Sequence, residues 1–258
     1  MNKIPLSVII PVFNSEKYLD KLIKTIIDDV AEIIICDSFS TDSTLEIAKS
    51  HYLKIIQKKY INSATQKNWA IPQATQAWVW IIDSDELPEL KLIEEIRAFI
   101  NTVDSNIDMA FIPRKNLFWG EFMGKASAYP DYQSRLFRRD KARYQDKEVH
   151  AQVKVPGKIH YLKYALVHDD FKEISVWWHR NNRYYKYELD ECLKREIKWS
   201  FKLQYIKPLY VFCRYYFLRR GFLHGFKGFF VAFQWLVYYF MVAAKLYEFE
   251  LKTSKKYL

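Results

Sequence analysis

The sequence predicts an α/β fold with a mainly parallel central sheet, followed by a basic, aromatic helical region. Three observations predict it. Short β-branched runs alternate with helical stretches over the first part of the chain, polar side chains recur where those runs end, and the last third combines positive charge with many rings. Half of the 258 residues are hydrophobic, which is enough to bury a sizeable core.

Strand-like and helical patterns alternate up to about residue 115. The strand-like runs read LSVIIPVF, EIIICD, KIIQKK, WVWIID and DMAFIP, and helices are expected over 16–29, 42–50, 64–74 and 89–101. This alternation is typical of a parallel sheet with helices on both faces. Ligands of such sheets bind beyond the carboxyl ends of the strands, so Asn14, Asp37 and Asp83 should share one edge.

Glycine and cysteine placement excludes several classes of protein. All six glycines follow residue 119, so the α/β part has neither a dinucleotide fingerprint nor a P-loop. The cysteines have no metal-ligand or redox spacing, which favours a reducing cytosol; they are Cys36, Cys192 and Cys213. Pro5 and Pro11 interrupt the apolar N-terminal run, so we expect a buried strand there and no signal peptide.

The middle of the chain is mixed. YQSRLFRR is expected to form a strand, and HAQVKVPGKIHYL is expected to form a hairpin that turns at Pro156 and Gly157. We therefore expect a catalytic domain over 1–170 and a helical C-terminal region over 171–258. Within the first, 1–115 would bind the donor and 116–170 would face the acceptor.

The C-terminal region carries the whole net charge of +10. Residues 171–258 hold 17 Lys plus Arg against 7 Asp plus Glu, and 26 of the 45 aromatic residues. Such a mixture suits nucleic acid, an anionic membrane surface or an acidic acceptor. Between Lys227 and Lys245 lie 17 uncharged residues, at the short limit for a spanning helix. The pattern favours a helix pair in the membrane interface; a short span, an aromatic cap and a dimer face are alternatives.

Acidic residues follow the apolar run WVWIID. Asp83 and Asp85 lie two positions apart, so both should lie on the same side of the chain. Two carboxylates there suit Mg²⁺ or Mn²⁺ holding a diphosphate. Glu86 is expected instead at the start of the next helix, facing its dipole. In DSFSTDST, Asp37 is expected to contact a base or ribose, and Asp42 to have a structural role.

Four motifs carry a family resemblance. SVIIPVFNSEKYL, IIICDSFSTDST, ATQKNWAI and WIIDSDE follow one another within the first 86 residues, and together they resemble the family 2 glycosyltransferases of GT-A fold. YPDYQSRLFRR, VHAQVKVPGKIHYLKYALVHDDF and the aromatic tail are similar to bacterial lipopolysaccharide and lipooligosaccharide inner-core β-1,4-glucosyltransferases. The resemblance implies inverting, metal-dependent transfer of a hexose, above all glucose from UDP-glucose, to a lipid-linked core sugar. It places the enzyme on the cytoplasmic face of the inner membrane.

The resemblance also implies roles for individual residues. It assigns the nucleotide sugar to nine of them, Pro11, Phe13, Asn14, Glu16, Asp37, Lys67, Asn68, Asp83 and Ser84. Asp83 and Asp85 match the D-x-D motif of the family, whose second acid binds the divalent cation, Mn²⁺ or Mg²⁺. His168 follows a short strand and is a further candidate metal ligand; the alternative is a satisfied polar group at a strand end.

The general base is the least determined part of the predicted site. An inverting transfer needs a group that takes the proton of the acceptor hydroxyl from the side opposite the leaving group. Relatives show His-Glu where this chain reads KEVHAQV, and Ala151 replaces that acid. Three base candidates are left, Asp131, Glu148 and His150. Arg135 and Arg138, with Arg139 beside them, are expected to bind acceptor phosphates; a basic strand edge is the alternative.

Other functions are also compatible with the sequence. A family 2 transferase could build capsule or exopolysaccharide on a polyprenyl diphosphate, and a degenerate transferase could bind a nucleotide sugar as a scaffold. A homodimer is a possible assembly. Nucleic-acid binding is disfavoured, because Asp37, Asp83 and Asp85 repel phosphate without a metal and the tail is too apolar for a solvated groove.

Overall fold

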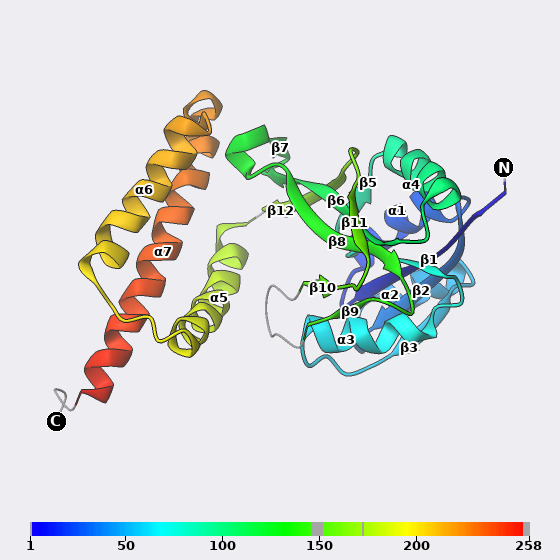
Figure 1. The fold of residues 1–258 in the computed structure, drawn as a ribbon, viewed down its shortest axis with the longest axis horizontal. Coiled ribbons are helices and arrows are strands. Elements are labelled where there is room, and N and C mark those ends of the chain that lie inside the picture. The colour runs from blue at the N-terminus through cyan, green and yellow to red at the C-terminus, as the bar shows by residue number, and fades with distance from the viewer. Residues whose placement is uncertain (1, 146–151, 172, 255–258) are drawn as a thin grey trace. The chain divides into compact units, whose positions relative to one another are not determined.

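The structure, a computed structural model, describes residues 2–145, 152–171 and 173–254 and divides into two compact units (Figure 1). Met1–Lys115 and Pro130–His168 form the first, here called the α/β unit, and Asn116–Tyr129 and Asp169–Leu258 form the second, the helical unit. The sequence placed 116–129 in the catalytic part. The structure assigns this segment to the helical unit because Phe118 and Met123 pack with Trp177 and Val231.

A ten-stranded sheet forms the centre of the α/β unit; eight of its strands follow the order β3-β2-β1-β4-β8-β6-β12-β5, and β7 and β11 pair with β6 off this path. The first four strands are parallel, namely β3 (Lys54–Gln57), β2 (Val30–Asp37), β1 (Ile4–Val12) and β4 (Trp78–Ile81). Next, β8 (Asp131–Arg138) pairs antiparallel with β4, and β6 (Ile107–Phe118) pairs antiparallel with β8. β12 (Leu166–Phe171) pairs antiparallel with β5 (Glu86–Pro88). The predicted α/β class is confirmed, and the parallel part of the sheet ends at β4.

Helices cover both faces of the parallel strands. Val8 and Ile10 of β1 face a core built with α1 (Glu16–Ile26), α2 (Thr44–Ser50) and α4 (Leu90–Thr102). Ile9 faces the opposite core, against α3 (Ser63–Ala70) and the 3₁₀ turn Ile71–Gln73. Buried side chains on both faces explain the unbroken apolar runs in the sequence. All four predicted helices are present, with ends within four residues of the expected positions.

The predicted hairpin at Pro156 and Gly157 is wrong. β10 (Val153–Lys154) pairs with β9 (Arg143–Tyr144) in a separate two-stranded sheet, whereas β11 (Lys158–Tyr161) pairs in parallel with β6. Gly157 is needed there for a close approach: its N–H donates to Asp108 Oδ2 over 2.8 Å, and a Cβ would lie 2.4 Å from that oxygen. Gly157 thus marks a close contact between distant segments of the chain and not a hairpin turn.

The helical unit is built around α7 (Gly225–Thr253), which packs on α5 (Ile174–Lys194) and α6 (Lys207–Cys213). π turns flank α6, and the unit also holds β7 and two 3₁₀ turns; their bounds are Lys202–Ile206, Arg214–Leu218, Glu121–Phe122, Gly124–Ser127 and Gly221–His224. Trp177 meets Phe230 at 5.9 Å and Tyr185 meets Tyr238 at 5.4 Å between ring centroids, so α5 and α7 run in the same direction. The sequence after Phe171 predicts a helix over 175–201; in the structure this helix, α5, ends earlier, at Lys194.

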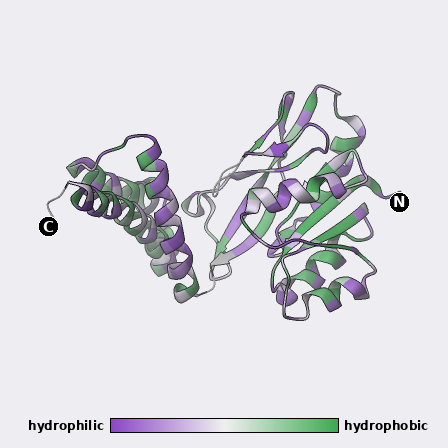
Figure 2. Ribbon diagram, turned by 90° about the horizontal axis from the view of Figure 1, so that it is seen from below, coloured by the Kyte–Doolittle hydropathy of each residue, from purple (hydrophilic) through white to green (hydrophobic). Residues whose placement is uncertain are grey.

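The long C-terminal helical segment is apolar around most of its surface. Within the described residues, Gly221–Thr253 is the one helical segment long and apolar enough to cross a membrane, and only 28% of its most apolar window is buried in the structure. Figure 2 shows hydrophobic residues on these helices as well as in the sheet of the α/β unit. At Gly228 a Cβ would lie 1.8 Å from the Gly221 carbonyl oxygen, so a glycine is required for this helix contact.

Candidate active site

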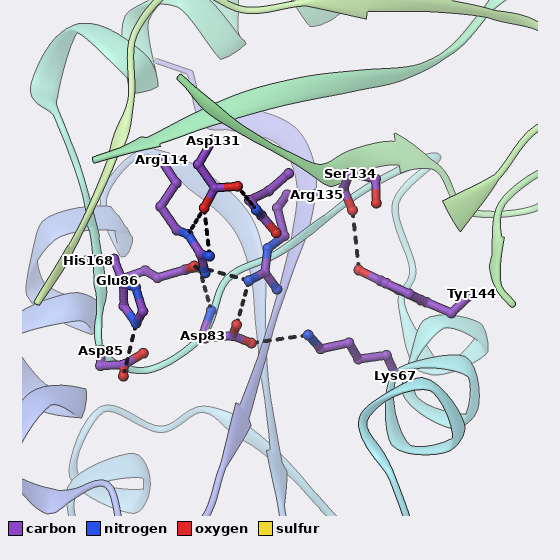
Figure 3. Close-up of polar contacts among 11 residues, drawn as sticks. Lys67, Asp83, Asp85, Glu86, Arg114, Asp131, Ser134, Arg135, Tyr144 and His168 are labelled. Carbon is purple, nitrogen blue, oxygen red and sulfur yellow. Dashed lines mark hydrogen bonds and ion pairs between the residues drawn. The ribbon is translucent and has the colours of Figure 1, made fainter. Parts of the chain in front are cut away.

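A tight turn after β4 carries the three acids of the DSDE stretch. The Glu86 N–H donates to the Asp83 carbonyl over 3.0 Å, and the Asp83 N–H donates to Glu86 Oε2 over 3.1 Å. The side chains then separate: Asp83 points toward Lys67 and Arg135, and Asp85 points toward His168 (Figure 3). Two carboxylates only two residues apart therefore have different surroundings and can do different chemistry.

Asp83 is held between two cations. Lys67 Nζ lies 3.2 Å from Asp83 Oδ1, and the Arg135 guanidinium donates to Oδ2. Burial alone would raise the pKa of Asp83, but Arg135 and Lys67 outweigh burial and hold that pKa well below its ordinary value. Burial lowers the pKa of Lys67, an effect that the Asp83 charge opposes in part. Asp83 is thus an ionised, fixed hydrogen-bond acceptor.

Glu86 is completely buried and holds two arginines together. Its Oε1 accepts from Arg135 Nη2 over 3.0 Å and from Arg114 Nη1 over 3.3 Å. The expectation that Glu86 starts the next helix is corrected, because it lies in β5 and α4 begins at Leu90. A fully buried carboxylate requires such charged partners, since it would otherwise be strongly destabilising.

Asp85, which is partly exposed, faces the buried His168. Asp85 Oδ2 lies 3.4 Å from His168 Nε2, and β12 places His168 opposite Glu86 in the strand pair. Burial raises the pKa of Asp85, but the hydrogen bond and charge of His168 outweigh it and lower that pKa. Burial lowers the pKa of His168, and Asp85 reverses this and raises it. The pair is therefore coupled electrostatically.

These two side chains fit a divalent cation that the protein holds by only two groups. A carboxylate oxygen and an imidazole nitrogen converge, and the Asp85 side chain is 39% exposed. In the described ranges no group of three or more His, Cys, Asp and Glu is placed to hold a metal ion. The remaining coordination positions would thus belong to diphosphate oxygens and water, as is usual where a hard cation binds with a substrate. Asp83, the third predicted ligand, is turned away toward Lys67.

Asp131 joins the same network from the start of β8. Its Oδ2 accepts from Arg114 Nε over 3.0 Å and from Nη2 over 2.7 Å, and its Oδ1 accepts from Gln133 over 2.7 Å. Burial lowers the pKa of Arg114, but Glu86 and Asp131 raise it overall. Arg114 therefore links the carboxylate of a base candidate to Glu86. The other two candidates, Glu148 and His150, lie outside the described residues.

The loops after β1 and β2 are fastened to each other. Asn14 Oδ1 accepts from the Thr41 N–H over 2.8 Å, and Glu16 Oε2 accepts from the Ser43 N–H over 3.0 Å. Asp42 returns the contact by accepting from the Glu16 N–H over 3.1 Å. Asn14 and Glu16, predicted at the nucleotide, thus also fix the shape of this edge.

Other predicted donor residues line the same edge. Pro11 lies in β1 beside Cys36 of β2, and the ring of Phe13 just beyond it is exposed. Asp37 is fully buried, and its carboxylate accepts from backbone and side-chain groups of its own loop and of β3. Ser84 donates to Ser15 Oγ over 2.9 Å, which joins the acidic turn to the loop after β1.

Asn68 connects α3 to β9 by two hydrogen bonds. Its Nδ2 donates to the Tyr144 carbonyl over 2.9 Å, and its Oδ1 accepts from the Tyr144 N–H over 2.8 Å. Both ends of the amide are therefore engaged, whereas Lys67 beside it reaches Asp83. The buried Tyr144 phenol donates to the Ser134 carbonyl over 3.3 Å, and burial raises its pKa further above neutrality (Figure 3).

The two arginines predicted to bind the acceptor have internal partners. Arg135 is buried between Asp83 and Glu86. Arg138 pairs with Trp78 at the amino end of β4, the end opposite the acidic turn, and donates to the Ile107 carbonyl over 3.0 Å. Arg135 is thus removed from an exposed acceptor surface, whereas an acceptor contact of the partly exposed Arg138 remains a prediction. Sequence reasoning missed Arg114, although a charged residue directly after the apolar run AFIP is a signal for a buried ion pair.

Comparisons with a family model and with curated proteins both find glycosyltransferases. The model of the family "Glycosyl transferase family 2" matches residues 7–157. The lipopolysaccharide core biosynthesis glycosyltransferase LpsC of Rhizobium meliloti (strain 1021) is 29% identical over 254 residues, covering 95% of this chain and 93% of LpsC. An uncharacterized glycosyltransferase of Rickettsia typhi is 27% identical, covering 93% of this chain and 86% of its own.

Two solved structures are also similar. Staphylococcus aureus TarS 1–349 in complex with UDP-GlcNAc has a TM-score of 0.49 at 19% identity, covering 71% of this chain and 64% of that one. Glucosyl-3-phosphoglycerate synthase of Mycobacterium tuberculosis, in complex with Mn²⁺ and UDP-glucose, has a TM-score of 0.47 at 15% identity, covering 67% and 73%.

The family match includes the parallel strands, both fastened loops and the acidic turn with Asp83 and Asp85. It spans more than half of the 258 residues. The mixed sheet, with helices on both faces and the polar cluster at its carboxyl edge, has the GT-A architecture expected of this family. The chain therefore belongs to glycosyl transferase family 2.

Proposed function

We propose that the chain is an inverting, metal-dependent hexosyltransferase that moves glucose from UDP-glucose to a lipid-linked inner-core sugar of lipopolysaccharide or lipooligosaccharide. The observation that carries the proposal is the Asp85 and His168 pair beside Lys67 and Asp83, at the ligand-binding edge of a family 2 sheet. The similarity to LpsC over nearly the whole chain supports the choice of a core sugar as acceptor.

The donor side follows from the charges at the acidic turn. Asp85 and His168 would hold the divalent cation, which when bound stabilises the negative charge that builds on the departing diphosphate. Lys67 adds positive charge at the same edge, although it is shared with Asp83. Asp83, ionised and fixed by Arg135, would accept a hydrogen bond from a hydroxyl of the donor. The fastened loops after β1 and β2 would enclose the base and ribose.

The acceptor side would use Asp131 as the base. Arg114 and Gln133 fix both oxygens of this carboxylate, so its orientation is set before an acceptor arrives. A base needs this fixed position more than any other property, because proton transfer requires hydrogen-bond reach to the attacking hydroxyl.

Asp131→Asn should lower kcat by about 10²-fold and leave the KM of the donor unchanged, because only proton transfer to the base is lost. Steady-state kinetics with saturating acceptor measures both values. Glu148→Gln and His150→Gln are the matched variants at the other two candidates. A loss of kcat in Glu148→Gln alone would reassign the role to Glu148.

The acceptor is tested with radiolabelled UDP-glucose and two purified acceptors, a truncated lipopolysaccharide core and a polyprenyl diphosphate saccharide. Label should appear only on the core. Transfer only to the polyprenyl acceptor would favour capsule or exopolysaccharide synthesis. Binding of UDP-glucose without transfer or hydrolysis, in the presence of Mn²⁺, would indicate a scaffold instead.

The helical unit would hold the enzyme at the cytoplasmic face of the inner membrane. Phe222, Phe226, Phe229 and Phe233 are exposed and recur at helical spacing along α7 and the turn before it, and Phe226 is 69% exposed. Basic residues lie among and beside them, namely Arg214, Arg219, Arg220 and Lys227. Buried Gln234 marks the face of α7 that packs inside the unit, which favours a helix lying in the interface over an isolated span.

Replacing Phe226 and Phe233 together by Glu should abolish sedimentation with vesicles that contain anionic phospholipid, because two large rings and their apolar area leave the interface. Tyr52→Glu is the matched control, since Tyr52 is 96% exposed but lies on the α/β unit. Binding of wild type should weaken at high salt. Equal sedimentation of the double variant and wild type would contradict this membrane surface.

A further inference from the structure

Phe39 combines an exposed ring with a conformation that is unusual for its residue type. Its φ is +65°, in the left-handed region, and its side chain is 53% exposed. A Cβ is crowded against the following carbonyl in this region, so bulky residues seldom adopt it. The ring gains little burial in return. Because Phe39 lies at the carboxyl edge of the sheet, where ligands bind, strain without local packing points to a function at this position.

Buried Asp37 imposes this conformation. Its carboxylate accepts from the Phe39 N–H over 2.9 Å and from the Ser40 N–H over 3.1 Å, and Gln57 of β3 donates to it over 2.9 Å. Asp37 is 0% exposed and ends β2, so its position is fixed by the sheet. The backbone after β2 is therefore bent by a rigid group, and the ring of Phe39 is turned out of the core.

A second exposed aromatic ring, that of Phe13, lies at the same edge of the sheet. Val12 of β1 is the register partner of Asp37, and Phe13 follows Val12 directly with 62% of its side chain exposed. The two loops are joined because the Asn14 N–H donates to Ser40 Oγ over 3.0 Å. Within the described residues, neither ring makes an aromatic contact with another side chain. Phe13 and Phe39 thus present two ring surfaces from adjacent, fastened loops.

Both loops are also tied to the charged cluster. Ser15, two residues after Phe13, accepts from Ser84 of the acidic turn over 2.9 Å. Ser38, next to Phe39, accepts from Gln66 over 2.6 Å, and Gln66 precedes Lys67. The rings therefore lie beside the elements that carry Asp85 and Lys67. A ligand with a flat apolar part and a diphosphate matches this order of groups.

We propose that Phe39 is held in the left-handed conformation so that its ring stacks on the base of the nucleotide donor, together with Phe13. This inference rests on the proposed function, in which the donor is a nucleoside diphosphate sugar. Stacking on a ring tolerates every base, because each base has a flat π face. Choice of the base would then depend on polar groups of the edge, and Phe39 would supply affinity.

Phe39→Gly tests the strained backbone and the stacking ring separately, because it should not lower the Tm but should weaken UDP binding. Glycine adopts this backbone conformation without steric cost, so the Tm should stay equal or rise. Loss of the ring should raise the Kd of UDP in Mn²⁺ roughly tenfold, the scale of one base stacked on an aromatic side chain. Inorganic pyrophosphate in Mn²⁺ should bind variant and wild type equally, because it has no base. Calorimetric titration and thermal unfolding measure these values, and Phe39→Trp should keep UDP affinity.

Tyr52→Gly is the matched control. Tyr52 has a φ of +55° and is 96% exposed, but it follows α2 at the amino ends of the strands. Its replacement relieves the same conformation and should leave UDP binding unchanged. An unchanged UDP Kd in Phe39→Gly, or a lower Tm, would overturn the proposal for Phe39 alone. A wild-type protein that binds pyrophosphate but none of UDP, GDP, CDP and ADP would overturn the nucleotide donor as well.

Discussion

Asp85→Asn should lower glucosyl transfer by at least about 10³-fold, because stabilisation of the leaving diphosphate by a cation contributes several kcal/mol to the transition state. The side chain is partly exposed and its one described protein partner is His168, so the fold should persist. Asparagine keeps the shape of the side chain and removes the charge. The loss should therefore appear in kcat, with unchanged circular dichroism and Tm.

A direct titration gives a second measurement of the same site. Mn²⁺ in the presence of UDP should bind wild type and not Asp85→Asn, as followed by calorimetry. Asp42→Asn is a matched control, because Asp42 fastens the neighbouring loops without facing the turn. EDTA should stop transfer by wild type, and Mn²⁺ should restore it. An Asp85→Asn protein that keeps transfer within tenfold of wild type would rule out this metal site.

Arg135→Met should destabilise the protein by about 3–5 kcal/mol, the usual cost of removing one partner from a buried ion pair. The methionine fills a similar volume, but buried Glu86 and half-exposed Asp83 lose the guanidinium they share. Denaturant unfolding followed by fluorescence measures the free energy of unfolding. Glu86 would keep only Arg114 as a charged partner, and at a longer distance.

Arg195→Met is the control for this variant. The Arg195 side chain is 70% exposed and is paired with Glu191, four residues earlier, and such surface pairs contribute about 1 kcal/mol or less. Adding Glu86→Gln to Arg135→Met should recover part of the lost stability, because the uncompensated charge is then absent. A loss below 1 kcal/mol in Arg135→Met would show that water or another cation compensates Glu86.

The sequence predicted those parts of the fold that depend on local pattern. Alternating apolar runs located β1, β2 and β4 and the helices between them, and the DSDE motif located the acidic turn. Family resemblance added His168, which lies 83 positions from Asp85 and reaches it only because β12 pairs with β5. Strand pairing over such distances has no local signature in a single sequence.

Pairing between charged residues that are distant in the sequence explains most of the differences between the predicted and the observed site. Glu86 and Arg135 were read from their neighbours in the chain, one as a helix start and one as an exposed acceptor contact. The partners of Glu86 come from β6 and β8, and those of Arg135 come from the acidic turn and β5, so burial of one residue depends on the placement of the others. Gly157 shows the same limit for a small residue. A glycine after a proline is typical of a turn, but this glycine is needed for the close contact with Asp108. Local composition cannot separate these cases.

The assignment of 116–129 to the helical unit has a consequence for dissecting the gene. The chain passes from one unit to the other three times, after Lys115, after Tyr129 and after His168. A stop codon near residue 170 would therefore keep segment 116–129 but remove α5 and α7. Phe118, Trp119 and Met123 of this segment would then lose their apolar neighbours. A soluble catalytic fragment requires two edits, the truncation and the replacement of 116–129 by a short polar connection.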